Sequence, residues 1–478
     1  MAFTYHPPTR SDCLVCQRLL QNDISPLIGN GKGKASSADD FPVHNWYNFV
    51  LGYTPEFPNY VLDKESITSS DLVIDPFMGA GTTLVCCKTR GIPSKGIDAN
   101  DFMVDAARAK LFWSLNTGKL KKHQDELLEL IFSISNGFAW EEPSNELASG
   151  VQSSLWSEAG KPSFHPFAKQ LRPNMLVEKY ISDKPFAKAK IIEEAINKVI
   201  ADSDEKELFN LALASILVPI SNVRYGPGFG VVQPKDDADV FRIFSSKVGR
   251  IIRDLECLTE SQKATPATVV LGDTRQLTHF FGESTASMMI TSPPYPGDHE
   301  YTKYTRLELA FQCKANNIND FRTIKRRMLQ ASTTNIYRDL DDSITVIDLE
   351  SIKLVTDLIK ERLEHDKATS GFEKLYTKLV WQYFGGMYKT LKECLRVLKP
   401  RAKIALLVSD SHAFKMVHIQ TAEILKEIGM NLGYINPEII LWQLKTSTSH
   451  KYYLRENILI MQKPDGRPFQ HDGCLTLG

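Results

Sequence analysis

The sequence lacks an excess of charge of either sign. Its 478 residues include 57 lysine and arginine residues and 57 aspartate and glutamate residues, so the formal net charge is zero. A global positive field that would attract nucleic acid is therefore excluded, and any nucleic-acid contact must use a local basic surface. Apolar runs are also short, and none reaches the roughly 18 residues of a membrane-spanning helix. We therefore expect no membrane segment.

The eight cysteines form no regular framework. Scattered thiols in a chain of this length are typical of a reduced, cytoplasmic protein. Cys13 and Cys16 have the spacing of metal ligands, but a zinc site needs four ligands, usually in paired sets, and no second close pair of this spacing is present. We therefore expect no metal site. The opening residues 1–6 have neither the basic nor the apolar region of a signal peptide, which also favours a cytoplasmic location.

Length and composition indicate a globular chain with more than one structural unit. Hydrophobic residues make up 42% of the sequence and charged residues 24%, which is ordinary for a globular protein. A chain of this length predicts two or three domains, or one domain with large insertions. In chain order we expect an irregular N-terminal segment (1–40), the first stretch of a catalytic α/β domain (41–113), a helical insertion (114–265), the second stretch of the domain (266–311), a helical basic segment (312–378), the third stretch (379–465) and a tail (466–478).

Short strands that alternate with helices predict a doubly wound α/β sheet. The strand Asp71–Asp75 ends on a carboxylate and leads through a glycine turn into a helix over Thr82–Arg90, and the next strand, Ser94–Asp98, again ends on a carboxylate. This order is the beginning of a doubly wound sheet. Further strands are expected at 267–271, 287–291 and 404–408, further helices at 102–113, 120–134, 191–201, 206–217, 239–258, 386–398 and 418–427, and a C-terminal antiparallel hairpin at 438–444 and 457–462.

A glycine turn joins the first strand to its helix. In Asp75-Pro-Phe-Met-Gly-Ala-Gly-Thr-Thr83 the glycines let the backbone approach a ligand closely, although such a turn can also be a tight connection and nothing more. Asp75 stands at the carboxyl end of the strand, where ligands of such sheets bind. A carboxylate there would repel a pyrophosphate but attract the ammonium and sulfonium groups of S-adenosylmethionine. The turn therefore favours this methyl donor over a nicotinamide dinucleotide.

Two further carboxylates complete the predicted donor site. Asp98 ends the second strand, at the place where an acid accepts hydrogen bonds from ribose hydroxyl groups. Asp273 follows the third strand and is placed to accept a hydrogen bond from the adenine amino group.

A proline pair follows the strand that ends at Thr291. In Thr291-Ser-Pro-Pro-Tyr295 the prolines fix φ and remove N–H groups, so the carbonyl oxygens of Ser292 and Pro293 can point into a cleft. Such acceptors would bind both hydrogens of an exocyclic amino group and aim its lone pair at a methyl group. Tyr295 offers an aromatic face to a base taken out of a nucleic-acid helix. The alternative is a stiff strand-end turn with a core tyrosine.

These motifs resemble those of the amino-methylating DNA methyltransferases. The glycine turn is similar to their motif I, residues 291–295 are similar to motif IV, and residues 44–58 resemble motif X, which closes over the methionine part of the cofactor. The linear order is X, I, IV. Segments at 221–227, 296–308, 383–387 and 456–459 resemble a bacterial group of site-specific DNA modification methylases.

The resemblance implies the class I S-adenosylmethionine-dependent fold and double-stranded DNA as the partner. The implied cofactor-binding residues are Trp46, Asp75, Phe77, Gly79, Gly81, Thr82, Thr83, Asp98 and Asp273. The implied catalytic residues are Ser292, Pro293, Pro294 and Tyr295.

The residue before Pro-Pro-Tyr bears on the target base. In this superfamily a serine there, as at Ser292, is usual for cytosine N4 methylation, and aspartate or asparagine for adenine N6. The resemblance therefore favours direct methyl transfer to N4 of a cytosine that is flipped out of the duplex. Adenine N6, an RNA base and a non-catalytic DNA-binding protein stay open, as do a cognate restriction or defence-system partner, the recognition sequence and the oligomeric state.

A local basic run after the proline pair is a candidate DNA contact. Such a run is typical of a solvated helix face, and it can also contact the phosphates that position a duplex. The loop 221–235 could line the base pocket or form a structural turn. The residues predicted to bind DNA are Arg322, Lys325, Arg326, Arg327 and Arg338.

Overall fold

The computed structural model describes residues 42–140, 161–225, 229–297, 300–337, 339–367, 370–414, 416–446 and 453–466. The predicted N-terminal segment, the pair Cys13 and Cys16, Arg338 and nearly all of the predicted tail lie outside the described residues. Across the described ranges, no helix is long and apolar enough to cross a membrane.

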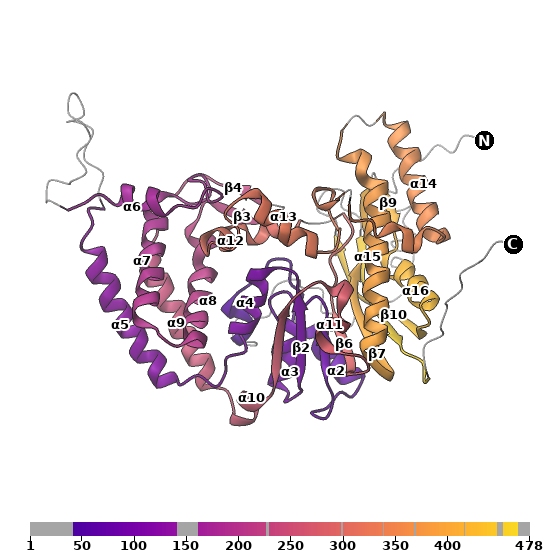
Figure 1. Ribbon diagram of the computed structural model, residues 1–478, viewed down its shortest axis with the longest axis horizontal. Coiled ribbons are helices and arrows are strands. Elements are labelled where there is room, and N and C mark those ends of the chain that lie inside the picture. The colour runs from indigo at the N-terminus through magenta and orange to yellow at the C-terminus, as the bar shows by residue number, and fades with distance from the viewer. Residues whose placement is uncertain are drawn as a thin grey trace.

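One mixed sheet of seven strands forms the centre of the molecule (Figure 1). Its order is β10-β11-β7-β6-β1-β2-β5, and the five strands from β7 to β5 run parallel. Strand β11 lies antiparallel between β7 and β10. The strands span β1 Val73–Asp75, β2 Ser94–Asp98, β5 Ala267–Leu271, β6 Ala286–Thr291, β7 Leu398–Ser409, β10 Ile435–Thr446 and β11 Tyr453–Gln462. The predicted α/β class and the C-terminal hairpin are confirmed.

Helices cover both faces of this sheet because its strands are apolar on both sides. On β1, Val73 packs in a cluster with helices α2 and α3, whereas Ile74 packs in a cluster with α15 and α16. Successive side chains of a strand point to opposite faces, so a strand buried on both faces reads as continuously apolar. These helices span α2 Glu56–Lys64, α3 Thr82–Thr89, α15 Tyr376–Val397 and α16 Thr421–Asn431.

The predicted helical insertion packs beside the sheet, against helix α4 (Asp101–Ala109), in the left half of Figure 1. Each helix expected between 114 and 265 is present. The bounds are α5 Thr117–Ser135, α6 Phe164–Leu171, α7 Asp183–Val199, α8 Ser203–Ile220, α9 Val240–Glu256 and α10 Glu260–Ala264. The insertion also holds the ribbon of β3 (Val223–Tyr225) and β4 (Phe229–Val231), where no strand was expected, because three-residue strands leave no periodic signal.

The segment between β6 and α15 contains short helices, loops and one helix of 16 residues, α14. The bounds of these helices are η4 Tyr301–Thr305, α12 Arg306–Phe311, α13 Ile318–Arg327, η5 Thr333–Asn335, η6 Ser343–Val346, α14 Glu350–His365 and η7 Glu373–Leu375. Helix α15 begins ten residues before its predicted start at Gly386. Gly385 and Gly386 concealed the first half of this helix in the sequence, because glycine is unfavourable inside a helix. Gly385 has a packing role, since a Cβ there would lie 2.0 Å from the carbonyl oxygen of Asp342, where the chain crosses the helix.

The predicted start of the last helix is also wrong. Residues 417–419 form strand β9, which pairs with β8 (Ser411–Phe414), and helix α16 begins only at Thr421. The alternation of buried Val417, exposed His418 and buried Ile419 has the period of a strand and was concealed by the helical pattern that follows.

Candidate active site

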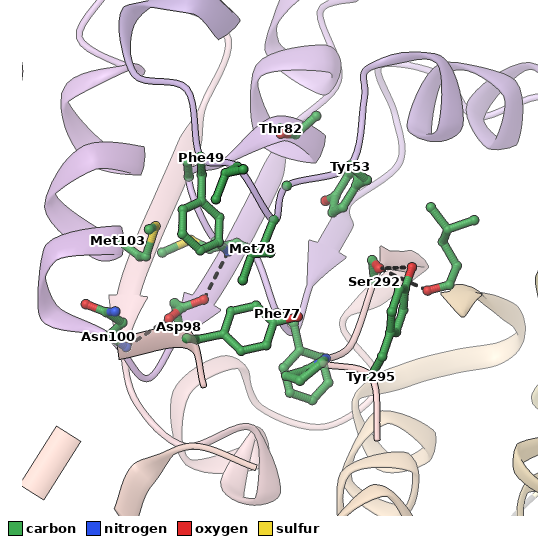
Figure 2. A pocket seen from close by; sticks show the side chains of 18 of the residues that line it. Phe49, Tyr53, Phe77, Met78, Thr82, Asp98, Asn100, Met103, Ser292 and Tyr295 are labelled. Atoms are coloured by element: carbon green, nitrogen blue, oxygen red, sulfur yellow. Dashed lines mark hydrogen bonds between the residues drawn. The ribbon is translucent and has the colours of Figure 1, made fainter. Parts of the chain in front are cut away.

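A cavity of about 760 Å³ opens at the carboxyl ends of the parallel strands (Figure 2). Residues of the predicted donor site, called the donor half below, and of the segment 291–295, called the acceptor half, both line it. Ligands of doubly wound sheets bind at this edge. From the donor half the cavity is lined by Phe77, Gly79, Thr82 and Asp98, and from the acceptor half by Ser292, Pro294 and Tyr295. Two motifs that are far apart in the sequence therefore face one volume.

The glycine turn shapes the floor of the donor half. Gly79 has φ +51° and Gly81 has φ +83°, conformations that side chains disfavour. A Cβ on Gly79 would meet nothing within 4 Å, so this glycine leaves free space beside the cavity. Gly81 does not line the cavity, and its missing side chain lets helix α4 approach, since a Cβ there would lie 3.1 Å from the Cβ of Ala107.

Asp98 lines the cavity and is held by the turn. Its Oδ2 accepts a hydrogen bond from the Gly79 amide at 3.0 Å, and its Oδ1 accepts one from the Asn100 amide at 2.8 Å. Burial raises the pKa of the Asp98 carboxyl to about 6, against the effect of these two amide hydrogen bonds. Each carboxylate oxygen keeps further acceptor capacity, which suits a ligand with hydroxyl groups.

Asp75 does not take the predicted position, because it does not line the cavity. Its side chain is fully buried and accepts hydrogen bonds from the hydroxyls of Tyr53 and Thr291, each at 2.6 Å, and from the Phe77 amide at 3.0 Å. Burial raises the pKa of this carboxyl. Asp75 therefore joins segments that form the walls of the cavity, and Asp98 is the aspartate of the donor half that lines it.

Trp46 also departs from its predicted role. The indole is fully buried, does not line the cavity, and donates from Nε1 to Asp254 of α9 at 2.8 Å. Phe49 and Tyr53, from the same segment, line the cavity instead. The aromatic pattern at 44–58 located the right segment but could not tell its core face from its cavity face.

Substitution separates these two faces. We expect Trp46→Ala to lower the free energy of unfolding by about 3–5 kcal/mol, because it leaves a large void in the core. We expect Phe49→Ala to weaken methyl-donor binding and to change stability by about 1 kcal/mol or less. Urea unfolding and calorimetric titration with the donor measure the two quantities. A Trp46→Ala protein of unchanged stability that fails to bind the donor would contradict this assignment.

The segment that carries Phe49 and Tyr53 is fixed by a buried lysine. Lys110 donates from Nζ to the carbonyl oxygens of Tyr47 at 2.8 Å and His44 at 3.2 Å. Burial lowers the pKa of the Lys110 ammonium to about 7. Lys110, Tyr47 and His44 all line the cavity, so this contact sets one of its walls.

The remaining donor-half predictions lie outside the cavity lining. Asp273 is bound through both oxygens by the Arg275 guanidinium, with Nη2 at 2.7 Å from Oδ2, and its neighbour Thr274 lines the cavity. Thr83 is buried beneath the turn, where its hydroxyl lies 2.6 Å from the Tyr53 hydroxyl.

The acceptor half presents a serine oxygen beside a tyrosine ring. The Ser292 hydroxyl donates to the Leu407 carbonyl oxygen at 3.0 Å and lies 3.3 Å from the Tyr295 hydroxyl. With its single proton committed to Leu407, the serine oxygen acts toward the cavity as an acceptor. Pro293 is buried and outside the lining, whereas Pro294 lines the cavity.

Three residues of the C-terminal hairpin, which no residue-level prediction included, complete the acceptor half. Glu456 of β11 accepts hydrogen bonds from the Tyr295 hydroxyl at 3.0 Å, from Lys445 and from Gln443, and all four residues line the cavity. Burial, followed by the Glu456 charge, raises the pKa of Tyr295 well above its usual range, so the phenol stays protonated. The only sequence signal for Glu456 was its place in the recognised segment 456–459.

The predicted basic run is largely neutralised by carboxylates. Lys325 pairs with Glu300 at 3.0 Å, and Arg326 pairs with Asp339 at 2.6 Å. Arg327 lines the cavity and binds Asp101 and the Ala99 carbonyl oxygen. Arg322 is exposed, and its Nη1 lies 3.2 Å from the Asn319 side-chain oxygen. The run does not form one free basic surface, because three of its four described side chains are held by carboxylates on different segments.

Among the described residues, no group of three or more histidine, cysteine, aspartate or glutamate side chains could hold a metal ion. The fold and the site thus define an α/β protein in which a buried carboxylate and a glycine turn share a cavity with a polar, tyrosine-lined wall.

Comparison with known proteins gives a consistent class. No family model matches the sequence. Type II methyltransferase M.BsoBI of Geobacillus stearothermophilus is 23% identical, with 88% of this chain and 86% of that protein covered. Type II methyltransferase M.AvaI of a Nostoc strain is 21% identical, with 88% and 87% covered. The chain is therefore similar over most of its length to type II methyltransferases, which confirms the resemblance stated from the motifs.

A shorter match has a higher identity. Type II methyltransferase M.MjaII of Methanocaldococcus jannaschii is 41% identical over 80 residues, which cover 17% of this chain and 15% of that protein.

Proposed function

We propose that this protein is a DNA methyltransferase that transfers a methyl group from S-adenosylmethionine to the exocyclic amino group of a base in duplex DNA, with cytosine N4 as the target. The observation that carries the proposal is the single cavity lined by both the glycine turn and the Ser-Pro-Pro-Tyr motif. The type II methyltransferase relatives support the reaction class. In this proposal the seven-stranded sheet is that of the class I S-adenosylmethionine-dependent methyltransferases, and the enzyme acts in the cytoplasm as part of a restriction–modification or defence system.

The donor half fits S-adenosylmethionine. The volume of about 760 Å³ lies within the range of small-molecule sites and leaves room for a base as well. The open space at Gly79 admits a ligand close to the backbone, and the Asp98 carboxylate can accept hydrogen bonds from ribose hydroxyls. Phe77 offers a ring for the adenine, and Phe49 and Tyr53 close the opposite wall (Figure 2). When bound, S-adenosylmethionine supplies an activated methyl group.

The acceptor half fits an amino group. The Ser292 oxygen, whose proton is committed to Leu407, accepts one amino hydrogen, and the ring of Tyr295 stacks on the base. Binding that hydrogen would favour localisation of the nitrogen lone pair, which would be directed at the methyl carbon of the donor. The nitrogen releases its proton to a neighbouring acceptor or water. No group of the chain has to form a covalent bond with the base.

Glu456 is a positioning residue in this proposal. Its carboxylate fixes the Tyr295 hydroxyl and ties Lys445 and Gln443 to the same point. We expect Glu456→Gln to lower kcat roughly tenfold to a hundredfold, because a tilted ring misplaces the base. The KM for the donor should stay within about twofold, since Glu456 lies in the acceptor half and not in the donor half. Steady-state kinetics separate the two constants.

Glu438→Gln is the matched control. Glu438 lies on the neighbouring strand β10, and its exposed side chain pairs with Lys64 outside the cavity, so kcat should not change. An equal loss of kcat and of donor affinity in Glu456→Gln would point instead to a collapsed cavity.

Two alternatives keep the same chemistry. Adenine N6 in DNA and an amino group of an RNA base present the same kind of nitrogen to the site, and Ser292 separates them only through family resemblance. Sequencing that detects modified bases, on DNA from cells that express the protein, reports the base and its sequence context together. Modified cytosines in one recurring sequence would support the proposal. Modified adenines would show that the target base is adenine and not cytosine.

A further inference from the structure

A second cavity of about 460 Å³ lies next to the active site. The two cavities share Glu300 and Ser332 in their linings, so they adjoin. The second cavity is built from the helical insertion, the short helices after β6, and the start of α15. We call it the 303/306 cavity, after the two cations in its wall, Lys303 and Arg306.

These two cations are not neutralised by the described part of the chain. Within the residues that the structure describes, neither Lys303 nor Arg306 forms an ion pair with a carboxylate. The Arg306 Nε is buried without a hydrogen-bond partner there, and its Nη1 makes a long contact of 3.4 Å with the Tyr180 hydroxyl. Glu300, a carboxylate in the lining, is already paired with Lys325. A buried guanidinium nitrogen without an acceptor is costly unless an anion binds there.

Aromatic side chains make up much of the remaining wall. Tyr180 and Phe229 of the insertion pack edge to face, with ring centroids 5.5 Å apart. Tyr304 lies between the two cations in the sequence, and Phe372, which is 55% exposed, packs edge to face with Tyr376. Among these rings Phe372 is exposed, Tyr180, Phe229 and Tyr376 are half-buried, and Tyr304 is buried. Cations beside accessible aromatic rings are the combination that binds unpaired nucleotides, because phosphates contact the cations and bases stack on the rings.

We propose that the 303/306 cavity binds the nucleotide next to the target base on the same strand, with Arg306 and Lys303 on its phosphodiester and an aromatic ring against its base or sugar. This inference rests on the proposed function. A base that enters the active-site cavity pulls its backbone out of the duplex, so the adjoining phosphate must pass close to the cavity mouth. The shared wall at Glu300 and Ser332 places the 303/306 cavity beside the active-site cavity.

Salt-dependent DNA binding tests the inference. A fluorescein-labelled DNA duplex of mixed sequence is titrated with the full chain, and the logarithm of the binding constant is followed against the logarithm of salt concentration. Each lost phosphate contact should reduce the magnitude of that slope by about 0.9 and weaken binding roughly tenfold at moderate salt. Arg306→Ala and Lys303→Ala should each have this effect. The double variant should reduce the magnitude of the slope by about twice as much as either single variant.

Matched controls remove a positive charge at the amino ends of the parallel strands, away from the carboxyl ends that form the cavities. Arg396 and Lys399 flank the start of β7, far from the strand ends that form the cavities, so Arg396→Ala and Lys399→Ala should keep the wild-type slope. Arg306→Gln retains part of the side chain that packs over Phe321 and guards against a folding defect. Unchanged donor binding in every variant confirms that the active-site cavity is intact.

The outcomes separate this inference from the proposed function. Slopes for Arg306→Ala and Lys303→Ala that equal the control slopes would overturn the inference, even if the wild-type enzyme methylates DNA. Reduced slopes would support it, even if methyl transfer is found on another base. Wild-type protein that binds no DNA at low salt would overturn both.

Discussion

Tyr295→Ala should abolish methyl transfer while leaving donor binding intact. The ring is the aromatic wall of the acceptor half, and its hydroxyl is held by Glu456 at 3.0 Å. Loss of base stacking removes about 1–3 kcal/mol, and loss of orientation adds to it, so kcat should fall at least roughly a hundredfold. Single-turnover transfer of a labelled methyl group measures the first quantity, and calorimetric titration with S-adenosylmethionine measures the second.

Two further variants make this result specific. Tyr295→Phe keeps the ring but loses the hydrogen bond to Glu456, so its kcat should fall only about tenfold. Tyr388→Ala removes an equal volume from helix α15, outside the cavity, and should retain the wild-type rate once folded. Wild-type activity in Tyr295→Ala would refute the assigned acceptor half.

Donor affinity should fall as the pH falls below about 6. Burial raises the pKa of the Asp98 carboxyl from 3.8 to about 6, and only the carboxylate can accept two ribose hydroxyl groups in addition to its amide hydrogen bonds. Affinity should therefore be constant above about pH 7 and fall by up to about tenfold per pH unit below the pKa. Titration of the donor from about pH 5 to pH 8 tests this dependence.

Asp98→Asn identifies the group that titrates. Removing the charge should weaken donor binding by about 1.5–3 kcal/mol, or roughly tenfold to a hundredfold, and should flatten the pH profile. In the absence of donor, the stability of the fold has the opposite pH dependence to donor affinity. A carboxyl whose pKa is higher in the folded state than in the unfolded chain makes the fold more stable as the pH falls from about 6 to about 4. A wild-type donor affinity that does not change with pH would contradict the role of Asp98.

Local chemistry explains what the sequence could predict. Strands β2 and β5 coincide with their predicted ranges. Strand β5 is a short run of apolar and β-branched residues, and β2 is a short segment that follows a helix and ends on a carboxylate. The two halves of the site were recognised because a glycine turn and a proline pair fix the backbone whatever surrounds them. The helices of the insertion were found from their apolar periodicity.

The errors arise where burial or long-range contact decides. Whether Asp75 faces the ligand or the core depends on Tyr53 and Thr291, which lie 22 and 216 residues away. Trp46 and Phe49 are three residues apart, and only packing against α9 separates the core residue from the cavity residue. Glu456 could not be placed in the site because the position of β11 beside β7 is set by the sheet as a whole.

The basic run illustrates the same limit for charge. Lys325, Arg326 and Arg327 are adjacent in the sequence, yet they pair with Glu300, Asp339 and Asp101. Lys303 and Arg306 stand apart from this run in the sequence, and they line a cavity without pairing with a carboxylate among the described residues. The run of adjacent cations in the sequence therefore predicts a basic surface at 325–327, whereas two cations that are left unpaired by carboxylates among the described residues lie in the 303/306 cavity.

Mass analysis of the nucleosides produced by the reaction identifies the methylated atom. Duplex DNA is incubated with the protein and methyl-labelled S-adenosylmethionine, digested, and compared with the same reaction of Tyr295→Ala. We expect labelled N4-methyldeoxycytidine with the wild-type protein and none with the variant. Label on cytosine C5, or no label in any nucleoside of the DNA, would contradict amino-group methylation of DNA at this site.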